Sequence, residues 1–359
     1  MEVRQRAAQL RRDGRPDAAA RALEGALVEA PQAWPLWHDL GLALNADGRP
    51  AAAAVALRRA LELGAAEVAG AWVNLGNALR SSGDKRGARS AYHEALRRDP
   101  DLAAAHYNQH AVLFDEHDPT PAVVALERAA SLRPDHLDTR FYLGALRRLL
   151  GLGEAAVLPE EARFLDESLA FVEAHRTAET RLFADTFDTL DAALAQARLP
   201  GAIVELGVRH GTTLRHLVAR AGDSAVFGFD SFEGLPEAWQ GQPAGLYRAP
   251  GALSDLPPDA RVAVGLFADT LPRFAAEHTA PLRLVHVDCD LHRSTAEAFA
   301  ALDRWLIAGT VLVFDEYLCN PGWQEEEHRA LDELLARRGL SADYLAFSLF
   351  TKQAVVRLR

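Results

Sequence analysis

The sequence contains little cysteine: its 359 residues include only Cys289 and Cys319. These two residues do not have the short spacing of metal-binding cysteine pairs. Two cysteines are also too few for the disulfide framework that holds small secreted domains together. The composition therefore favours a protein that folds around hydrophobic cores in a reducing compartment, and we expect it to be cytoplasmic.

Long hydrophobic runs are also missing. No stretch approaches the roughly 20 apolar residues that span a bilayer. Three of residues 1–6 are charged, unlike the apolar core of a signal peptide. Basic residues are in the minority, since 39 lysines and arginines stand against 50 aspartates and glutamates, a formal net charge of −11. A chain this acidic, without a basic arm or stripe, is not expected to bind nucleic acid or a membrane surface.

The first half of the chain repeats itself. The spacings between successive turn positions are 34, 35, 34 and 34 residues, at Gly14, Gly48, Gly83, His117 and Gly151. Small residues recur in the same register, at Ala19, Ala53, Ala88 and Ala122 and again at Ala26, Ala60, Ala95 and Ala129. A period of 34 residues is that of the tetratricopeptide repeat.

Residues 1–155 resemble this repeat family, and the unit from Trp72 to Pro100 carries its aromatic, Leu-Gly, small and proline positions in order. Small residues let two helices approach closely, glycine turns between them, and proline ends the second helix. We therefore expect an all-helical solenoid. The resemblance implies a surface for a protein or peptide partner or for self-association, and a role as a mere spacer stays open.

The repeat pattern ends near Gly153. Residues 156–199 carry a broad apolar stripe typical of helices, and they include no Gly/Ser-rich linker. We expect this segment to be a helical connector that leads into a second domain over residues 200–359.

From residue 200 onward, short apolar runs alternate with helical patterns. Strands are predicted at 202–206, 225–229, 262–266, 282–287, 310–314, 344–350 and 353–358. Such alternation is typical of an α/β domain in which helices cover both faces of a mostly parallel sheet. The last two runs are separated by little more than Thr351 and Lys352, which predicts a hairpin. We expect a Rossmann-like, mostly parallel seven-stranded sheet with an antiparallel hairpin at its edge.

A glycine turn follows the first of these strands. Gly207 and Gly211 allow a tight turn before a helix predicted from Thr212, and a helix N-terminus offers main-chain N–H groups to a ligand. A dinucleotide-binding fingerprint has a middle glycine where this chain has Arg209. The bulk of arginine hinders close approach of a pyrophosphate, which disfavours a nicotinamide cofactor.

Carboxylates follow several strands at the points where they end. Asp288 and Asp290 follow the fourth predicted strand, and Asp315 and Glu316 follow the fifth. The ends of neighbouring parallel strands meet at one rim, where these groups repel one another unless a proton or a cation joins them. Carboxylate oxygens suit Mg²⁺ or a similar divalent ion.

With these motifs, residues 178–359 resemble the class I S-adenosylmethionine-dependent methyltransferases, and more narrowly the macrocin and mycinamicin sugar O-methyltransferase family. The motifs that carry the resemblance are Glu205-Leu-Gly-x-x-x-Gly211, Phe229-Asp-Ser-Phe-Glu-Gly-Leu-Pro236, His286-Val-Asp-x-Asp-Leu-x-x-Ser294 and Phe314-Asp-Glu-Tyr317. The chain departs from the usual pattern at two positions, where His292 replaces a tyrosine and Glu316 replaces an aspartate.

The resemblance implies particular contacts to the cofactor S-adenosylmethionine. The residues implied are Glu205, Gly207 and Gly211 at its methionine part, Asp230 and Ser231 at its ribose, and Phe267, Ala268 and Asp269 near its adenine. It also implies Mg²⁺ or a similar ion beside the acceptor hydroxyl, with Asp288 or Asp290, Asp315 and Glu316 as ligands. Asp288 and His292 are the candidate catalytic residues. For His292, the roles of general base, substrate contact and bystander stay open.

Three functions are open at this point. The first is an O-methyltransferase acting on a hydroxyl of a sugar or a glycosylated small molecule. The second is a repeat-based adaptor with an inactive methyltransferase-like domain, which the clustered carboxylates argue against. The third is a nicotinamide-dependent oxidoreductase, which Arg209 disfavours. Residues 232–260, with Trp239 and Tyr247, form a long insertion of the kind that commonly acts as a lid.

Overall fold

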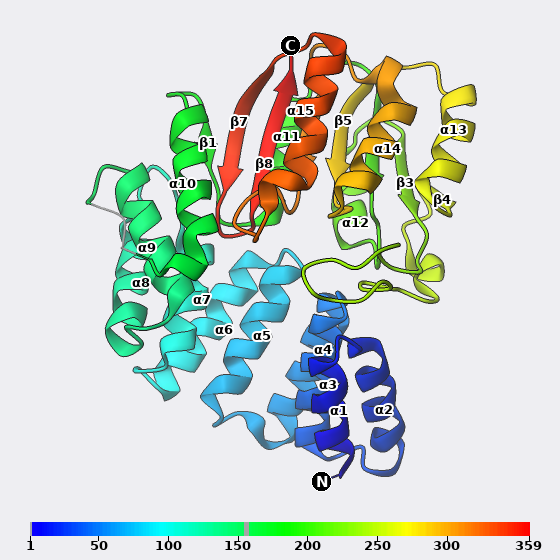
Figure 1. Ribbon diagram of the computed structural model, residues 1–359. Coiled ribbons are helices and arrows are strands. Elements are labelled where there is room, and N and C mark those ends of the chain that lie inside the picture. Colours follow the sequence, from blue (N-terminus) through cyan, green and yellow to red (C-terminus); the bar gives the residue numbers. More distant parts are fainter. Residues whose placement is uncertain (1, 154–157) are drawn as a thin grey trace. The chain divides into compact units, whose positions relative to one another are not determined.

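The computed structural model describes residues 2–153 and 158–359. The chain divides into two units, Met1–Ala156 and Val157–Arg359 (Figure 1). The domain boundary expected between residues 155 and 156 lies outside the described residues. Within the described ranges, no helix is both long enough and apolar enough to cross a membrane.

The first unit consists of helices in consecutive pairs, and every element described in it is helical. The helices are α1 (Glu2–Arg12), α2 (Pro16–Glu29), α3 (Trp34–Ala46), α4 (Pro50–Ala60), α5 (Ala69–Ser81), α6 (Lys85–Arg98), α7 (Ala103–Leu113), α8 (Thr120–Leu132) and α9 (Leu137–Leu149), with a π-helical turn η1 (Leu61–Ala65) after α4. Gly48 and Gly83 lie in the predicted turns with φ of 79° and 85°, a region in which glycine is favoured. The predicted helical stack is confirmed.

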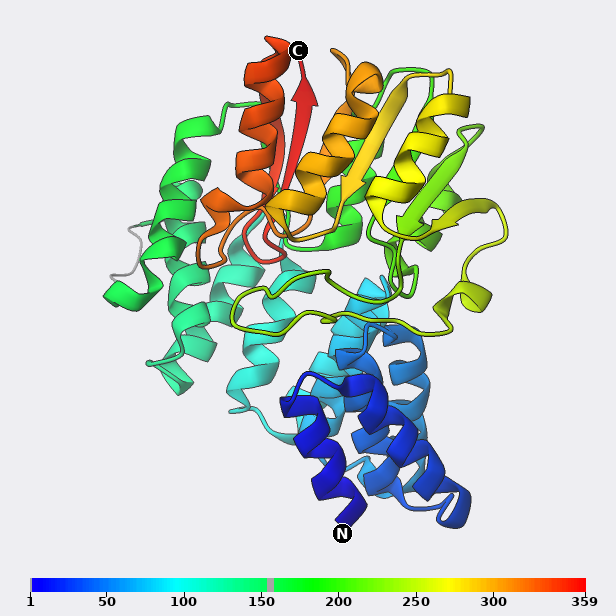
Figure 2. The ribbon, with the colours of Figure 1, turned by 45° about the vertical axis from the view of Figure 1, so that its right-hand side comes forward.

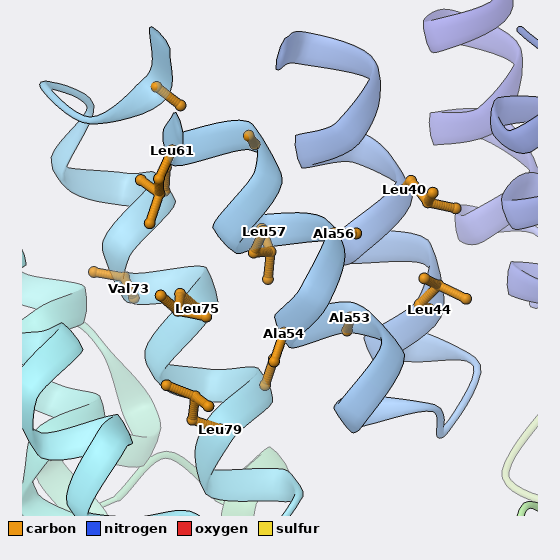
Figure 3. Packing of buried hydrophobic residues seen from close by; sticks show 14 of the residues in the cluster. Leu40, Leu44, Ala53, Ala54, Ala56, Leu57, Leu61, Val73, Leu75 and Leu79 are labelled. Atoms are coloured by element: carbon orange, nitrogen blue, oxygen red, sulfur yellow. The ribbon is translucent and has the colours of Figure 1, made fainter. Parts of the chain in front are cut away.

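Close helix contacts explain the repeated small residues. In Figure 3, Leu57 of α4 lies between α3 and α5 among other buried leucines and alanines. A side chain added at Gly41 of α3 would collide with Leu57, and one added at Gly76 of α5 would collide with Tyr92 of α6. Glycine is therefore required at positions 41 and 76 by the packing of the two helices of a repeat.

The second unit is a sheet covered by helices. Its strands are β1 (Arg181–Leu182), β2 (Ala202–Leu206), β3 (Val226–Asp230), β4 (Ala260–Val264), β5 (Leu282–Val287), β6 (Val311–Phe314), β7 (Ala342–Ser348) and β8 (Gln353–Leu358). Its α-helices are α10 (Arg163–His175), α11 (Thr186–Gln196), α12 (Thr212–Arg220), α13 (Phe267–Glu277), α14 (His292–Leu302) and α15 (Glu327–Arg338). Its 3₁₀ turns are η2 (Glu160–Ala162), η3 (Ala252–Asp255), η4 (Asp303–Trp305) and η5 (Trp323–Glu325).

The strand order is β1-β7-β8-β6-β5-β2-β3-β4, and β8 alone runs antiparallel to its two neighbours in the described sheet. The mostly parallel Rossmann-like fold is confirmed. One detail of the prediction is wrong: β1 adds an eighth strand inside the segment expected to be a helical connector, so the β7–β8 hairpin is not outermost. A strand of two residues is too short to show an alternation of apolar and polar residues in the sequence. The strand β1 forms by pairing with the main chain of β7.

Helices α13, α14 and α15 cover one face of the sheet, and α11 and α12 cover the other (Figure 1). Because β2, β5 and β6 are buried on both faces, their sequences read as apolar runs. The carboxyl ends of the parallel strands share one edge of the sheet. The long segment between β3 and β4 runs along that edge (Figure 2).

Candidate functional site

A cavity of about 410 Å³ opens at the edge where the parallel strands end. Its wall is formed by the turns after β2, β3, β4, β5 and β6, by the start of α14, and by residues 234–236 and Tyr247 from the segment between β3 and β4. This location is the usual ligand site of an open α/β sheet.

Asp230 joins two of these turns. Its Oδ2 accepts hydrogen bonds from the main-chain N–H groups of Val208 at 2.7 Å and Arg209 at 2.6 Å. Its Oδ1 accepts one from the N–H of Phe232 at 2.6 Å. A carboxylate has about four lone-pair sites, so Asp230 keeps acceptor capacity for a ligand hydroxyl while it holds both turns in place.

Gly207 lies where the turn after β2 touches the turn after β5. Its φ is 91°, and a side chain built there would collide with the main-chain carbonyl of Asp288. Glycine is therefore required by both conformation and space. Gly211, with φ of 70°, precedes α12 and packs against Leu256, and it is not part of the cavity wall.

The residues predicted to lie near adenine are only partly brought together. Phe267 and Ala268, at the start of α13, line the cavity together with Ser231. Asp269 lies outside the wall, and its main-chain N–H donates to the carbonyl of Leu266 at 3.0 Å. Gly265 and Leu266 complete this end of the cavity.

Glu205 lies inside the sheet and not in the cavity wall. It is fully buried, and its Oε1 is 2.9 Å from Nδ1 of His286, the residue paired with it on β5. Nε2 of His286 lies 3.9 Å from Oδ1 of Asp315 on the other side. Although burial opposes a charge on the imidazole, the neighbouring carboxylates of Asp315 and Glu205 raise the pKa of His286 well above its usual value.

The four carboxylates at the ends of β5 and β6, Asp288, Asp290, Asp315 and Glu316, all line the cavity, and we call them the acidic group. Burial and repulsion from Asp315 raise the pKa of Asp288 well above its usual range. Burial and repulsion from Glu316 raise the pKa of Asp290 to about 8. Burial also raises the pKa of Glu316. The negative charges of the acidic group are therefore not balanced by one another, and a nearby positive charge would stabilise them.

Two neighbouring side chains stabilise these carboxylates, one by its positive charge and one by a hydrogen bond. Nζ of Lys352 lies 3.1 Å from Oε2 of Glu316, and the side-chain amide of Gln353 donates to Asp315. In the part of the chain that the structure describes, no three histidine, cysteine, aspartate or glutamate side chains are grouped so that they could hold a metal ion.

His292 opens α14 and lies outside the cavity wall. Its main-chain N–H donates to Oε2 of Glu326 at 2.9 Å, and its Nε2 lies 3.1 Å from Oε2 of Glu333. The ring is therefore engaged by α15, a helix whose position relative to α14 is not readable from the sequence.

Three residues near the acidic group were not among the predicted site residues. Tyr247 and Arg293 line the cavity, and Glu327 is fully buried beneath the turn after β5. Oε1 of Glu327 accepts from the N–H of Cys289 at 3.5 Å, and burial raises the pKa of Glu327 well above its usual range. Tyr247 lies in the long insertion that was predicted to act as a lid, whereas Arg293 reads as an ordinary helix residue. The acidic run that includes Glu327, just past the fifth predicted strand, predicts another wall of the pocket, but Glu327 does not line the cavity.

Comparison with known proteins follows this division of the chain. Residues 204–317 match the family model of a methyltransferase domain, and residues 69–102 match that of the tetratricopeptide repeat. No curated protein matches the chain.

Among solved structures, the chain is similar to CalS11, described as a calicheamicin methyltransferase. The two are 23% identical, the match covers 59% of this chain and 91% of that one, and the TM-score is 0.41. It is also similar to the O-methyltransferase NovP, at 20% identity over 48% of this chain and 78% of that one, with a TM-score of 0.38. MamA matches at 23% identity over 47% of this chain and 94% of that one, with a TM-score of 0.37. These scores are too low to carry an argument about function.

The sheet order, the glycine turn and the cavity at the strand ends define a Rossmann-like domain with a ligand site at its usual edge. Together with the two family matches, they show a protein in which tetratricopeptide repeats precede a methyltransferase domain. The class of enzyme expected from the sequence, an S-adenosylmethionine-dependent methyltransferase, is confirmed at this level.

Proposed function

We propose that this protein is an O-methyltransferase that acts on a hydroxyl of a sugar or a glycosylated small molecule. One observation carries the proposal: a single cavity wall contains Gly207 and Asp230 on one side and the acidic group on the other. The first side suits a nucleoside-type cofactor, and the second suits a substrate hydroxyl.

S-adenosylmethionine would bind with its ribose hydroxyls on Asp230 and Ser231 and its methionine part over Gly207. Its adenine would lie near Phe267 and Ala268. The free acceptor capacity of Asp230 supports the ribose position, because its three main-chain hydrogen bonds leave room for a hydroxyl donor.

At the other side of the cavity, Asp288 and Asp290 line the wall, and one of the two carboxylates would accept the proton of the acceptor hydroxyl. S-adenosylmethionine, when bound, would supply the methyl group and leave as S-adenosylhomocysteine, and the carboxylate would take the proton that the hydroxyl releases as it becomes the methyl ether. Holding the two reactants in one cavity removes much of the entropic part of the barrier, and a positioned base adds to the rate.

We further propose that Mg²⁺ or a similar divalent ion binds at the acidic group. The donor type suits such an ion, because four carboxylates line one wall, and burial together with repulsion raises the pKa of Asp288 and Asp290. No three of the side chains in the described part of the chain are grouped closely enough to hold an ion as they lie, so binding would have to draw Asp288, Asp290, Asp315 and Glu316 together. When bound, such an ion lowers the pKa of a coordinated hydroxyl. Glu316 already has Lys352 as a partner, so the ion would compete with that contact.

Thermal unfolding with candidate cofactors tests the assignment, because a ligand that binds only the folded state raises Tm. We expect S-adenosylhomocysteine to raise Tm and NAD⁺ to leave it unchanged. The reverse result would favour the oxidoreductase. If S-adenosylmethionine binds but no nucleotide sugar or glycoside in a screen gains a methyl group by mass spectrometry, the inactive adaptor becomes the better reading.

For the repeats, we propose a surface for a protein or peptide partner or for self-association. The regular helix pairs support this, since such stacks present extended surfaces. Light scattering of the full chain tests self-association, and a monomer at all concentrations would leave the partner or the spacer role.

A further inference from the structure

The segment between β3 and β4 places a tyrosine in the cavity wall that none of the steps above uses. This segment, residues 232–256, is folded back on itself by main-chain hydrogen bonds. Leu235 donates to Leu246 at 2.8 Å, Gly245 donates to Leu235 at 2.9 Å, and Ala249 donates to Phe232 at 3.1 Å. Tyr247 therefore lies on a loop that is held by its own main-chain hydrogen bonds. This loop runs along the edge where the strands end (Figure 2).

Arg209 supports the ring of Tyr247. The guanidinium carbon of Arg209 lies over that ring, 5.0 Å from its centroid, which is the geometry of a cation–π contact. Both residues line the cavity, and both have positive φ, 50° for Arg209 and 66° for Tyr247. Non-glycine residues keep this conformation only where their surroundings hold them in it. The surrounding structure therefore holds Arg209 and Tyr247 in contact in the cavity wall.

The pair also connects the two sides of the cavity. The main-chain N–H of Arg209 donates to Asp230, on the proposed ribose side. Tyr247 lies close enough to the acidic group for its charges to act on the phenol. Burial first, and then the negative charges of Asp290 and Glu316, raise the pKa of Tyr247 well above its usual value. An uncharged aromatic ring thus lines the same cavity as the acidic group, where the acceptor hydroxyl is proposed to bind.

We propose that Tyr247 is a specificity-determining residue that stacks on the C–H face of a sugar acceptor, and that Arg209 is the positioning residue that holds its ring. This inference rests on the proposed function. A pyranose has polar edges and an apolar face, so an aromatic ring beside a group of carboxylates fits both of its surfaces. Acceptors that lack such a face would then bind poorly.

A purely structural role for Tyr247 is the competing explanation. Its ring centroid lies 6.3 Å from that of Trp239 in the same segment, and Trp239 is buried. Tyr247 would then serve to fold the loop and would have no direct effect on the acceptor. A test must therefore separate the ring from the fold of the segment.

The test compares four variants of the full chain, each saturated with S-adenosylhomocysteine and titrated with methyl α-L-rhamnopyranoside by NMR. Tyr247→Leu removes the ring, Tyr247→Phe keeps the ring without the hydroxyl, and Arg209→Gln removes the cation. Leu253→Ala is the matched control, because Leu253 lies in the same segment, is 51% exposed and is not in the cavity wall.

We expect Tyr247→Leu to weaken sugar binding about tenfold and Tyr247→Phe to change it by less than about twofold. Arg209→Gln should weaken it about threefold, and Leu253→Ala should leave it unchanged. The affinity for S-adenosylhomocysteine, measured by calorimetry, should be the same in Tyr247→Leu, Tyr247→Phe and Leu253→Ala.

Wild-type affinity for the sugar in Tyr247→Leu would overturn the inference. So would an equal loss in Tyr247→Phe, which would assign recognition to the hydroxyl, or an equal loss in Leu253→Ala, which would assign it to the fold of the segment. A wild-type protein that binds S-adenosylhomocysteine but not the rhamnoside also overturns it. Failure of the wild type to bind S-adenosylhomocysteine is a different result, because it removes the proposed function itself.

Discussion

At the scale of single residues, Asp230 has two tasks that the sequence pattern does not separate. Its carboxylate holds the turns after β2 and β3 through three main-chain N–H groups, and it faces the cavity. Removing it leaves those N–H groups without their acceptor and also removes the proposed ribose contact. A loss of affinity in an Asp230 variant therefore has both a structural and a direct part.

We expect Asp230→Ala to weaken binding of S-adenosylhomocysteine by roughly 1–3 kcal/mol, since a buried polar group that loses its partner costs about that much. Calorimetry on the purified variant measures it. The matched control is Asp269→Asn, because Asp269 was predicted near adenine but lies outside the cavity wall. Unchanged affinity in Asp230→Ala would place the cofactor elsewhere, and a loss in Asp269→Asn would restore the original prediction for that residue.

Asp315 tests the proposed ion. We expect Asp315→Asn to abolish methyl transfer and to leave cofactor affinity nearly unchanged, because the ion would contact the acceptor. We also expect a chelator to remove the activity of the wild type and Mg²⁺ to restore it. Isothermal titration of Mg²⁺ into wild type and variant gives a readout that is independent of turnover. Full activity in excess chelator is the outcome that would end the metal proposal.

At the scale of elements, α7 departs from the repeat at one position that the packing makes critical. His110 occupies the place that Gly76 holds one repeat earlier, where α5 and α6 touch. It is buried, its Nδ1 lies against the main-chain carbonyl of Tyr107, and its ring stacks on that of Tyr142 with centroids 5.9 Å apart. Burial lowers the pKa of His110 to about 4.

This histidine should make the stability of the chain depend on pH. Because its pKa is lower in the folded state than in the unfolded state, the unfolded chain binds the proton first as the pH falls. Stability is therefore lost as the pH falls from about 6.5 toward 4, and the loss at pH 5 is about 2 kcal/mol. Urea unfolding at pH 7 and pH 5, followed by circular dichroism, measures it.

The comparison for this prediction is His110→Asn, in which the pH-dependent loss should shrink by that amount. His117→Asn is the control, because the side chain of His117 is 79% exposed. An equal pH dependence in wild type and His110→Asn would show that the buried ring is not the titrating group.

At the scale of the whole molecule, the described cavity belongs to the second unit. All residues of the cavity wall lie between Gly207 and Glu316, inside the second unit. The repeats therefore contribute no side chain to the described cavity. This separation supports the proposal that they bind a partner or a second copy and are not needed for the chemistry.

We expect a chain that begins at Leu158 to fold and to bind S-adenosylhomocysteine with the affinity of the full protein. Thermal unfolding checks that the shortened chain is folded, and calorimetry measures its affinity. A shortened chain that unfolds cooperatively but does not bind the cofactor would contradict the division of labour. In that case the repeats would have to support the site.

Periodicity, glycine turns and apolar runs are local signals, and they predict the repeat register, the helix turns and seven of the eight strands. The sequence also indicated which strand ends carry carboxylates. It did not reveal β1, which is two residues long and exists because β7 offers a free edge.

The positions of the individual side chains follow from tertiary packing. Glu205 contacts His286 because the two residues are paired on the neighbouring strands β2 and β5. His292 contacts Glu333 because α15 packs beside α14. Tyr247 entered the cavity wall because its segment folds back along the strand ends. Each of these outcomes depends on partners tens of residues away in the chain, and no local pattern encodes which of them will meet.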